Sequence, residues 1–224
     1  MSNKEYLYEK FQIEEYMVNF LNDVLSTQWD TKDKKEIVFL GDSLIRDYDL
    51  SRFFPNIKEK LFNCGVSGIT TEGLFNILKQ GVVRHKPKTI VILAGTNDMN
   101  EYNDKRDGEI IFNIARIITK LKIILQEVNI VLISILPCDE KRYGKEVVGG
   151  GRENSRIIKV NEELKNFERY FKDLYYIDVF KSFVDKSGNL INSLTHDGLH
   201  LNIKGYEKLT VSIEPIVNML LKKD

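Results

Sequence analysis

Residues 37–45 read IVFLGDSLI, a short apolar run that ends abruptly in Gly41-Asp42-Ser43-Leu44. A strand that is apolar at every position is covered on both faces, and such strands are parallel and joined by helices. Four more short apolar runs follow along the chain. We therefore predict five strands, at Ile37–Leu40, Leu61–Asn63, Thr89–Leu93, Ile130–Ile135 and Tyr175–Ile177.

Longer segments with helical spacing separate these runs. Within residues 109–127, for example, isoleucine and leucine recur at three- and four-residue steps and form one apolar stripe. We predict helices over Thr71–Val83, Glu109–Glu127, Glu153–Tyr170 and Ile203–Leu221. The alternation of strands and helices predicts a doubly wound α/β domain over residues 36–224.

Two further segments lie outside this alternation. Residues 1–35 precede the first strand, and we expect them to form a helical extension packed on the domain, because apolar residues recur at helical spacing at Ile13, Met17, Phe20, Leu21 and Val24. Pro137–Arg152 reads as a loop that contains Gly149-Gly150-Gly151. It follows the fourth strand, so we expect it at the carboxyl end of the sheet, where open α/β folds bind ligands.

Composition narrows the class of protein. The 224 residues include 33 Lys plus Arg and 33 Asp plus Glu, which gives no support to a nucleic-acid or anionic-membrane partner. The longest apolar runs, Ile90–Ala94 and Ile130–Leu136, fall far short of the roughly 18 residues that span a bilayer. The N-terminus lacks the pattern of a secretory signal, and two cysteines cannot form a disulfide framework. We expect a soluble, cytoplasmic protein, and nothing in the sequence defines its oligomeric state.

The first strand ends where an active site of an open sheet belongs. Ser43 follows the strand directly, so its hydroxyl can stand at a helix N-terminus, where free N–H groups favour an oxyanion. Gly41 allows the backbone to turn tightly. The ordinary alternative is a serine that only caps a helix.

A second polar segment, Asp197-Gly198-Leu199-His200, precedes the last predicted helix. Side chains three residues apart can lie on one side of a turn. The Asp197 carboxylate can then accept the Nδ1 proton of His200, which leaves Nε2 to deprotonate a hydroxyl. The alternative is a turn with a solvated histidine.

Two glycine-containing loops follow the second and third predicted strands. They are Asn63–Thr71 and Ala94-Gly95-Thr96-Asn97-Asp98. Both open at the same end of the sheet as Ser43, and a glycine N–H and an asparagine amide are donors suited to an oxyanion hole. Each could instead be an ordinary turn.

These four segments, spread over about 160 residues, together resemble the four blocks of the SGNH hydrolases, also called GDSL-type esterases and lipases. The resemblance implies a flavodoxin-like three-layer α/β/α sandwich with a five-stranded parallel sheet. It implies that Ser43 is the nucleophile, His200 the general base and Asp197 the third member of a catalytic triad. The implied oxyanion hole uses the backbone N–H groups of Ser43 and Gly68 and the side chain of Asn97.

The remaining residues of the motifs take supporting places in this scheme, namely Gly41, Asp42, Gly95 and Asp98. Gly65 competes with Gly68 for the oxyanion hole, and Gly68 is preferred because it stands just before the threonine pair. His196 is interpreted as a loop or substrate-contacting residue. We expect His85 to be solvated, and Tyr206, Leu209 and Val211 to belong to the core of the last helix.

Other catalytic classes lack their residues. The elbow G-x-S-x-G is absent, because Gly41–Ile45 and Gly65–Ile69 both lack the final glycine. No H-E-x-x-H, C-x-x-C or Walker-type loop is present, so we expect neither a metal nor an organic cofactor.

The sequence therefore predicts a serine hydrolase that cleaves small-molecule carboxylic esters through an acyl-enzyme. The preferred substrates are short-acyl esters such as acetyl groups, with O-acetylated carbohydrate as a candidate suggested by the family. A lysophospholipase or acyl-thioesterase is the enzymatic alternative, with an apolar groove that could involve Val147-Val148. A non-catalytic carbohydrate-binding module on the same fold is the alternative of another class.

Overall fold

The computed structural model of the chain describes residues 35–222, and these contain a five-stranded sheet in the order β2-β1-β3-β4-β5. All neighbouring strands are parallel, and the order is the flavodoxin-like one, as predicted. Every predicted strand is present, with ends moved by no more than two residues. The strands are β1 (Ile37–Gly41), β2 (Leu61–Gly65), β3 (Thr89–Leu93), β4 (Asn129–Ile133) and β5 (Leu174–Ile177).

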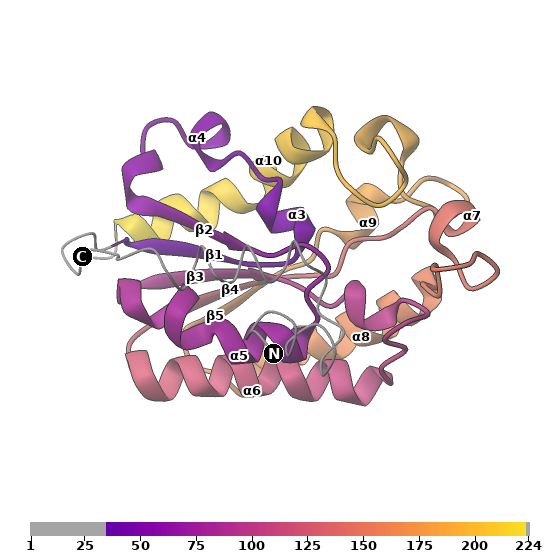
Figure 1. Cartoon of the computed structure of the whole chain (residues 1–224). Coiled ribbons are helices and arrows are strands. Elements are labelled where there is room, and N and C mark those ends of the chain that lie inside the picture. Colours follow the sequence, from indigo (N-terminus) through magenta and orange to yellow (C-terminus); the bar gives the residue numbers. More distant parts are fainter. Residues whose placement is uncertain (1–34, 223–224) are drawn as a thin grey trace, which may run out of the picture.

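Helices cover both faces of the sheet, with α5, α6 and α8 on one side and α3, α4, α9 and α10 on the other (Figure 1). The bounds are α3 (Ser43–Arg46), α4 (Leu50–Phe53), α5 (Thr71–Gly81), α6 (Asp107–Leu125), α7 (Glu140–Tyr143), α8 (Asn154–Lys165), α9 (Phe180–Phe183) and α10 (Ile203–Leu221). Short 3₁₀ turns lie at η1 (Lys58–Lys60), η2 (Val83–His85), η3 (Asn97–Met99), η4 (Asn166–Arg169) and η5 (Asn192–Leu194). The helix predicted over Glu153–Tyr170 ends earlier, at Lys165, because the next four residues form the tighter 3₁₀ turn η4.

The core is divided between the two faces because strand side chains alternate. Val38 and Leu40 of β1 belong to the cluster under α5, α6 and α8, whereas Ile37 and Phe39 pack with α3 and α10. All five residues of β1 are buried, which explains the uninterrupted apolar run at this position.

Two predictions about side-chain burial are wrong. His85 is 3% exposed, since turn η2 places its ring 4.2 Å from that of Phe62 on β2, centroid to centroid. Val211 is 72% exposed, because it lies on the face of α10 opposite Tyr206 and Leu209, which are buried as expected.

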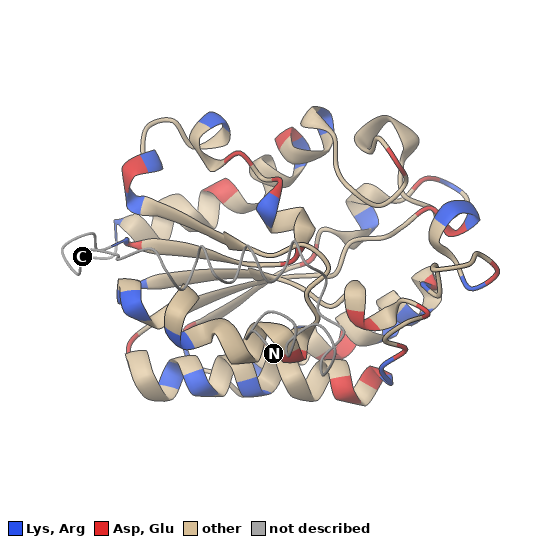
Figure 2. Cartoon of the chain, viewed as in Figure 1, with Lys and Arg blue, Asp and Glu red and all other residues tan. Residues whose placement is uncertain are grey.

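The predicted helical extension over residues 1–35 lies outside the described residues, apart from Lys35. This prediction rests on the spacing of Ile13, Met17, Phe20, Leu21 and Val24. Over residues 35–222, no helix has the length and apolar character needed to cross a membrane. Charged residues of both signs are spread over the helices and loops in Figure 2, so neither sign dominates the face shown.

Candidate active site

Ser43 is the first residue of α3 and follows the carboxyl end of β1 by two positions. Asp42 is the N-cap, and its Oδ1 accepts the N–H of Leu44 at 2.9 Å. A Cβ on Gly41 would lie 2.1 Å from the carbonyl oxygen of Leu93 on β3, so only glycine fits at this strand end. The close approach of β1 to β3 therefore requires glycine at position 41. Ser43 begins α3 two residues later and is 6% exposed.

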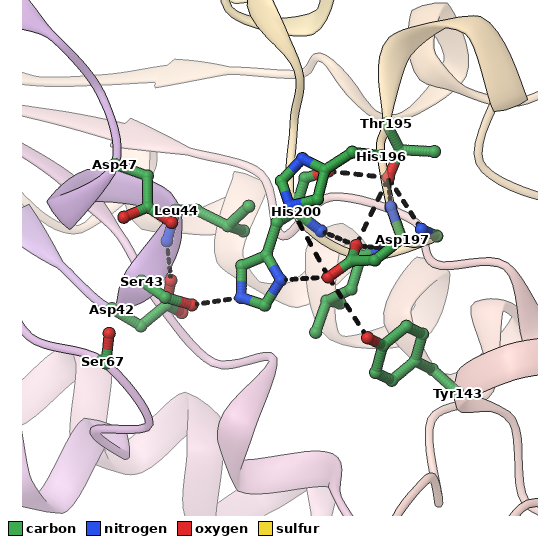
Figure 3. A network of polar contacts seen from close by, with 12 residues as sticks. Asp42, Ser43, Leu44, Asp47, Ser67, Tyr143, Thr195, His196, Asp197 and His200 are labelled. Atoms are coloured by element: carbon green, nitrogen blue, oxygen red, sulfur yellow. Dashed lines mark hydrogen bonds and ion pairs between the residues drawn. The ribbon is translucent and has the colours of Figure 1, made fainter.

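The His200 imidazole reaches Ser43 from the other end of the chain. Its Nε2 lies 2.9 Å from Ser43 Oγ, and its Nδ1 lies 2.6 Å from Asp197 Oδ2 (Figure 3). Hydroxyl, imidazole and carboxylate therefore form one continuous hydrogen-bonded chain, with the imidazole between the two oxygens.

Asp197 is held in its ionised form. Partial burial opposes its charge, but hydrogen bonds from the His200 side chain and from the backbone N–H groups of Leu199 and His200 outweigh this and lower the pKa of Asp197 to about 2. Its Oδ1 accepts those N–H groups at 2.8 and 2.7 Å. The carboxylate is therefore charged at neutral pH and can hold the Nδ1 proton of the histidine.

A threonine that the motif does not include shapes this loop. The Thr195 hydroxyl donates to the carbonyl of His200 at 2.7 Å and accepts the N–H of Gly198 at 2.8 Å. Gly198 has a φ of +99°, a region that favours glycine. The Thr195 hydroxyl and the glycine together close the turn that puts Asp197 beside His200.

Tyr143 of α7 makes a second contact that no motif in the sequence predicts. Its hydroxyl donates to Asp197 Oδ2 at 3.3 Å. The sequence predicts a loop over residues 137–152 at the carboxyl end of the sheet. They contain α7, and through Tyr143 they reach the Asp197 carboxylate.

The candidate oxyanion donors Gly68 and Asn97 lie in the loops that follow the two strands flanking β1. Gly68 follows β2 and has a φ of +68°, whereas Asn97 begins η3 after β3 and is 6% exposed. The Asn97 Nδ2 donates to the carbonyl of Ile69 at 3.2 Å, so the two loops touch each other. Gly65, the competing glycine, lies inside β2, where a Cβ would meet the backbone nitrogen of Arg46 at 2.1 Å. Its role is the close packing of β2 against α3.

The other motif residues brace these loops. Asp98 accepts the backbone N–H and the hydroxyl of Thr71 at 2.9 and 2.6 Å, which ties the loop after β3 to the start of α5. Burial raises the pKa of Asp98 despite these hydrogen bonds. Gly95 has a φ of +124°, and a Cβ there would lie 2.6 Å from Ile135.

Asp42 lies in an environment unlike that of Asp197. It is fully buried, and within residues 35–222 its Oδ2 has no hydrogen-bond partner. Burial raises the pKa of Asp42 to about 7, although the N–H of Leu44 and the charges of His200 and Arg152 act in the opposite direction.

His196 stands at the outer edge of the site. Its side chain is 60% exposed, its Nε2 lies 3.9 Å from Asp197 Oδ2, and its ring stacks on that of His200 at 6.0 Å between centroids. His196, Asp197 and His200 offer three potential metal-ligating atoms within 4.8 Å of one another. A cation there would compete with the Nδ1 proton of His200 for the same carboxylate oxygen.

The fold and this hydrogen-bonded chain define an α/β enzyme of the ester-hydrolase class. The chain belongs to the GDSL-like Lipase/Acylhydrolase family, whose model matches residues 39–208. The resemblance to the SGNH hydrolases is thereby confirmed, and the protein is a carboxylic ester hydrolase.

Solved structures agree with this assignment. A structure from Streptococcus pneumonia, whose name refers to platelet activating factor, is 26% identical and has a TM-score of 0.78 over 95% of each chain. A lipase/acylhydrolase from Enterococcus faecalis is also 26% identical, with a TM-score of 0.66 over 82% of this chain and 95% of that one. The parallel five-stranded architecture is therefore shared across nearly the whole described domain.

Relatives with carbohydrate-related names also match. An N-acylneuraminate cytidylyltransferase from Escherichia coli is 26% identical over 183 residues, which are 81% of this chain and 40% of the relative. The chain thus spans about two fifths of that relative's length. A carbohydrate esterase family 3 protein from Talaromyces cellulolyticus shares the fold at 18% identity, with a TM-score of 0.66 over 85% of this chain and 99% of that one. An acetyl xylan esterase also shares the fold at 18% identity and a TM-score of 0.66, over 81% and 98%.

Proposed function

We propose that the protein hydrolyses short-acyl esters, with acetyl groups on carbohydrates as the substrate class, and that Ser43 is the nucleophile. The observation that carries the proposal is the continuous chain from Ser43 Oγ through His200 to Asp197, with distances of 2.9 and 2.6 Å. A nucleophile, a base and an orienting carboxylate in hydrogen-bond reach of one another are the arrangement that activates a serine.

The reaction then proceeds in two steps. Ser43 Oγ attacks the ester carbonyl carbon while its proton passes to His200 Nε2. The negative charge that develops on the carbonyl oxygen is held by the N–H groups of Ser43 and Gly68 and by Asn97 Nδ2. The C–O bond to the alcohol breaks, and the alcohol leaves with the proton from His200. Water, deprotonated by His200, attacks the acyl-enzyme and releases the carboxylic acid and Ser43.

The surroundings of the triad favour a polar substrate over a fatty one. Val148, which could have lined an acyl groove, is 90% exposed and projects into solvent. On the same segment, Arg142 and Asp139 pack against Gly198 beside the triad, since a Cβ on that glycine would lie 3.0 Å from each side chain. Short polar esters suit such a rim better than the long acyl chains of a lysophospholipase or thioesterase.

The names of three relatives point in the same direction. The acetyl xylan esterase and the carbohydrate esterase are named for acyl or sugar substrates, and N-acylneuraminate is itself an acylated sugar acid. Because the chain spans two fifths of the cytidylyltransferase, nucleotidyl transfer is not proposed. We place the activity in the cytoplasm, where the two buried free thiols of Cys64 and Cys138 suit a reducing compartment.

The nucleophile is tested with Ser43→Ala. We expect turnover of p-nitrophenyl acetate to fall on the order of 10⁶-fold with the melting temperature preserved, because only the reacting oxygen is removed. Ser212→Ala on α10 is the matched control, because among the described residues its hydroxyl donates to the carbonyl of Lys208 on the same helix. Fluorophosphonate should label wild type and the control but not Ser43→Ala. Turnover of Ser43→Ala within tenfold of wild type would contradict the assignment, and an inert, unlabelled wild type would favour the binding-module alternative.

The substrate class is tested separately with a chain-length series of p-nitrophenyl esters and with O-acetylated sugars. We expect kcat/KM to be highest for acetate and to fall with chain length. A preference for octanoate would instead support the lysophospholipase or thioesterase alternative.

A further inference from the structure

Arg152 is a buried cation directly behind the candidate oxyanion hole. It ends the segment 137–152, just before α8, and is 4% exposed. Its Nε donates to the carbonyl oxygen and the hydroxyl of Thr96 at 3.1 and 3.0 Å. Its Nη2 donates to Asn97 Oδ1 at 3.2 Å. The guanidinium thus donates hydrogen bonds to Thr96 and Asn97, two consecutive residues of the loop that follows β3.

This contact decides which way the Asn97 amide faces. A guanidinium has only donors, so it must meet the oxygen of the amide and not its nitrogen. With Oδ1 facing Arg152, Nδ2 lies on the other side of the amide. One of its two N–H groups donates to the carbonyl oxygen of Ile69. Within residues 35–222 the second N–H makes no further hydrogen bond, so it can meet a substrate oxygen. The Ile69 carbonyl, which can only accept, requires the same orientation, because a flip would set Oδ1 against that carbonyl and Nδ2 against the guanidinium.

Within residues 35–222, no carboxylate in direct contact neutralises the charge of Arg152. Its recorded hydrogen-bond partners within the described part of the chain are neutral oxygens of Thr96, Asn97 and Gly150. A cation bound to the amide oxygen withdraws electron density from the amide and makes its N–H a stronger donor. In a buried site such a fixed charge acts at short range with little screening.

The segment that carries Arg152 is itself fixed in place. The backbone N–H of Arg152 donates to the carbonyl of Tyr143 at 3.0 Å, and the guanidinium lies 5.7 Å from the centre of the Tyr143 ring. Gly151, with a φ of +81°, approaches so closely that a Cβ would lie 2.5 Å from the backbone nitrogen of Glu101. Substitution of the arginine is therefore a local change in a braced segment.

We propose that Arg152 is the positioning residue of the oxyanion hole: it orients the Asn97 amide and polarises its N–H toward the developing oxyanion. This inference rests on the proposed function, because Asn97 must be an oxyanion donor for its orientation to matter. Arg152 does not itself touch the substrate in this scheme. It acts only through Asn97.

A double-mutant cycle on p-nitrophenyl acetate tests this dependence. We expect Asn97→Ala to lower kcat by about 10²- to 10³-fold, the range for loss of one oxyanion donor. Arg152→Met should lower kcat by about 10- to 100-fold with KM changed less than threefold, since the ground-state ester gains little from the amide. In the Asn97→Ala background, Arg152→Met should cost less than a further threefold, because its target is already gone. Arg152→Lys, which keeps the charge, should recover part of kcat.

Arg156→Met is the matched control. Arg156 lies on α8, four residues after Arg152, and its side chain is 17% exposed. Its partners are Asp104, Asp107 and the carbonyl of Lys105, and within the described residues it bonds neither Thr96 nor Asn97. We expect its kcat to stay within twofold of wild type. If Arg152→Met does not fold, judged by its melting curve, Arg152→Lys enters the same cycle.

Additive effects of Arg152 and Asn97 substitutions, or an unchanged kcat in folded Arg152→Met, would overturn the proposal while leaving the esterase assignment intact. A wild type without Ser43-dependent turnover would overturn both. The two failures are therefore distinguishable from the Ser43→Ala result alone.

Discussion

Two aspartates flank the Ser43–His200 hydrogen bond, and their environments are opposite. Asp42 lies at the end of β1, is fully buried, and has its pKa raised to about 7 by that burial. Asp197 lies in the loop before α10, its side chain is 30% exposed, and hydrogen bonds lower its pKa to about 2 against the effect of its partial burial. The Asp42 carboxyl group is surrounded by the core, which disfavours its charge, whereas polar contacts within a turn stabilise the charge of Asp197.

The difference teaches that the two halves of this site are stabilised by different forces. Ser43 and Asn97, each 6% exposed, occupy ends of packed strands or the turns that follow them, so the sheet core places them. His200 and Asp197 are placed by hydrogen bonds of a half-exposed loop, with Thr195 closing it. Substitutions in the loop half should therefore change activity more than stability, whereas Asp42 should affect stability and its pH dependence.

Among substitutions that test the contrast between the two aspartates, the largest effect is expected from Asp197→Asn. Asparagine keeps an acceptor for the N–H groups of Leu199 and His200, but its amide donates to His200 Nδ1. The imidazole must then carry its proton on Nε2, where it cannot accept the proton of Ser43. We expect kcat to fall on the order of 10⁴-fold. The measurement is steady-state turnover of p-nitrophenyl acetate.

Asp185→Asn, on an exposed turn away from the site, serves as the control for loss of one carboxylate. A loss of less than tenfold in Asp197→Asn would show that the carboxylate does not set the histidine tautomer.

A smaller effect, on stability, is expected from Asp42→Asn. Because the folded protein raises the pKa of Asp42 above its unfolded value of about 4, the folded state binds this proton more tightly. The stability that this proton contributes is present below about pH 4 and is lost as pH rises through about 7. Asparagine keeps the N-cap acceptor but has no charge to bury.

The free energy of unfolding of wild type should therefore fall relative to Asp42→Asn between pH 4 and 8, by a few kcal/mol. Urea unfolding at intervals of one pH unit measures this difference. Parallel curves for the two proteins would show that the buried carboxyl group does not titrate in this range.

The smallest effect is expected from Tyr143→Phe. Its hydroxyl bonds Asp197 Oδ2 at 3.3 Å, a long contact, and the ring that packs near Arg152 is retained. We expect kcat to fall about three- to tenfold, in line with about 1 kcal/mol for one hydrogen bond, with KM unchanged. An identical loss in Tyr170→Phe, an exposed tyrosine after η4, would mean that the effect is not local to Asp197.

Local patterns were sufficient for the fold class. A strand that is buried on both faces, such as β1, needs apolar residues at every position, so the residue types alone predict it. The helix over Ile203–Leu221 has the predicted bounds, since its apolar spacing and the Asn202 cap are both local. The segments of Ser43 and His200 are weak signals separately, and they predict a site because four such segments, each after a strand or before a helix, together resemble one family.

The sequence by itself determined the order of the strands along the chain, the end of the sheet at which the motifs gather, and the residue types available for acyl transfer. Only the tertiary structure decided that His85 is buried and that Tyr143 and Arg152 reach Asp197 and Asn97. The physical reason is range. Periodicity and capping depend on neighbours a few residues away. The contacts of Tyr143 with Asp197 and of Arg152 with Asn97 join residues 54 or 55 positions apart, and their geometry exists only after the sheet has assembled.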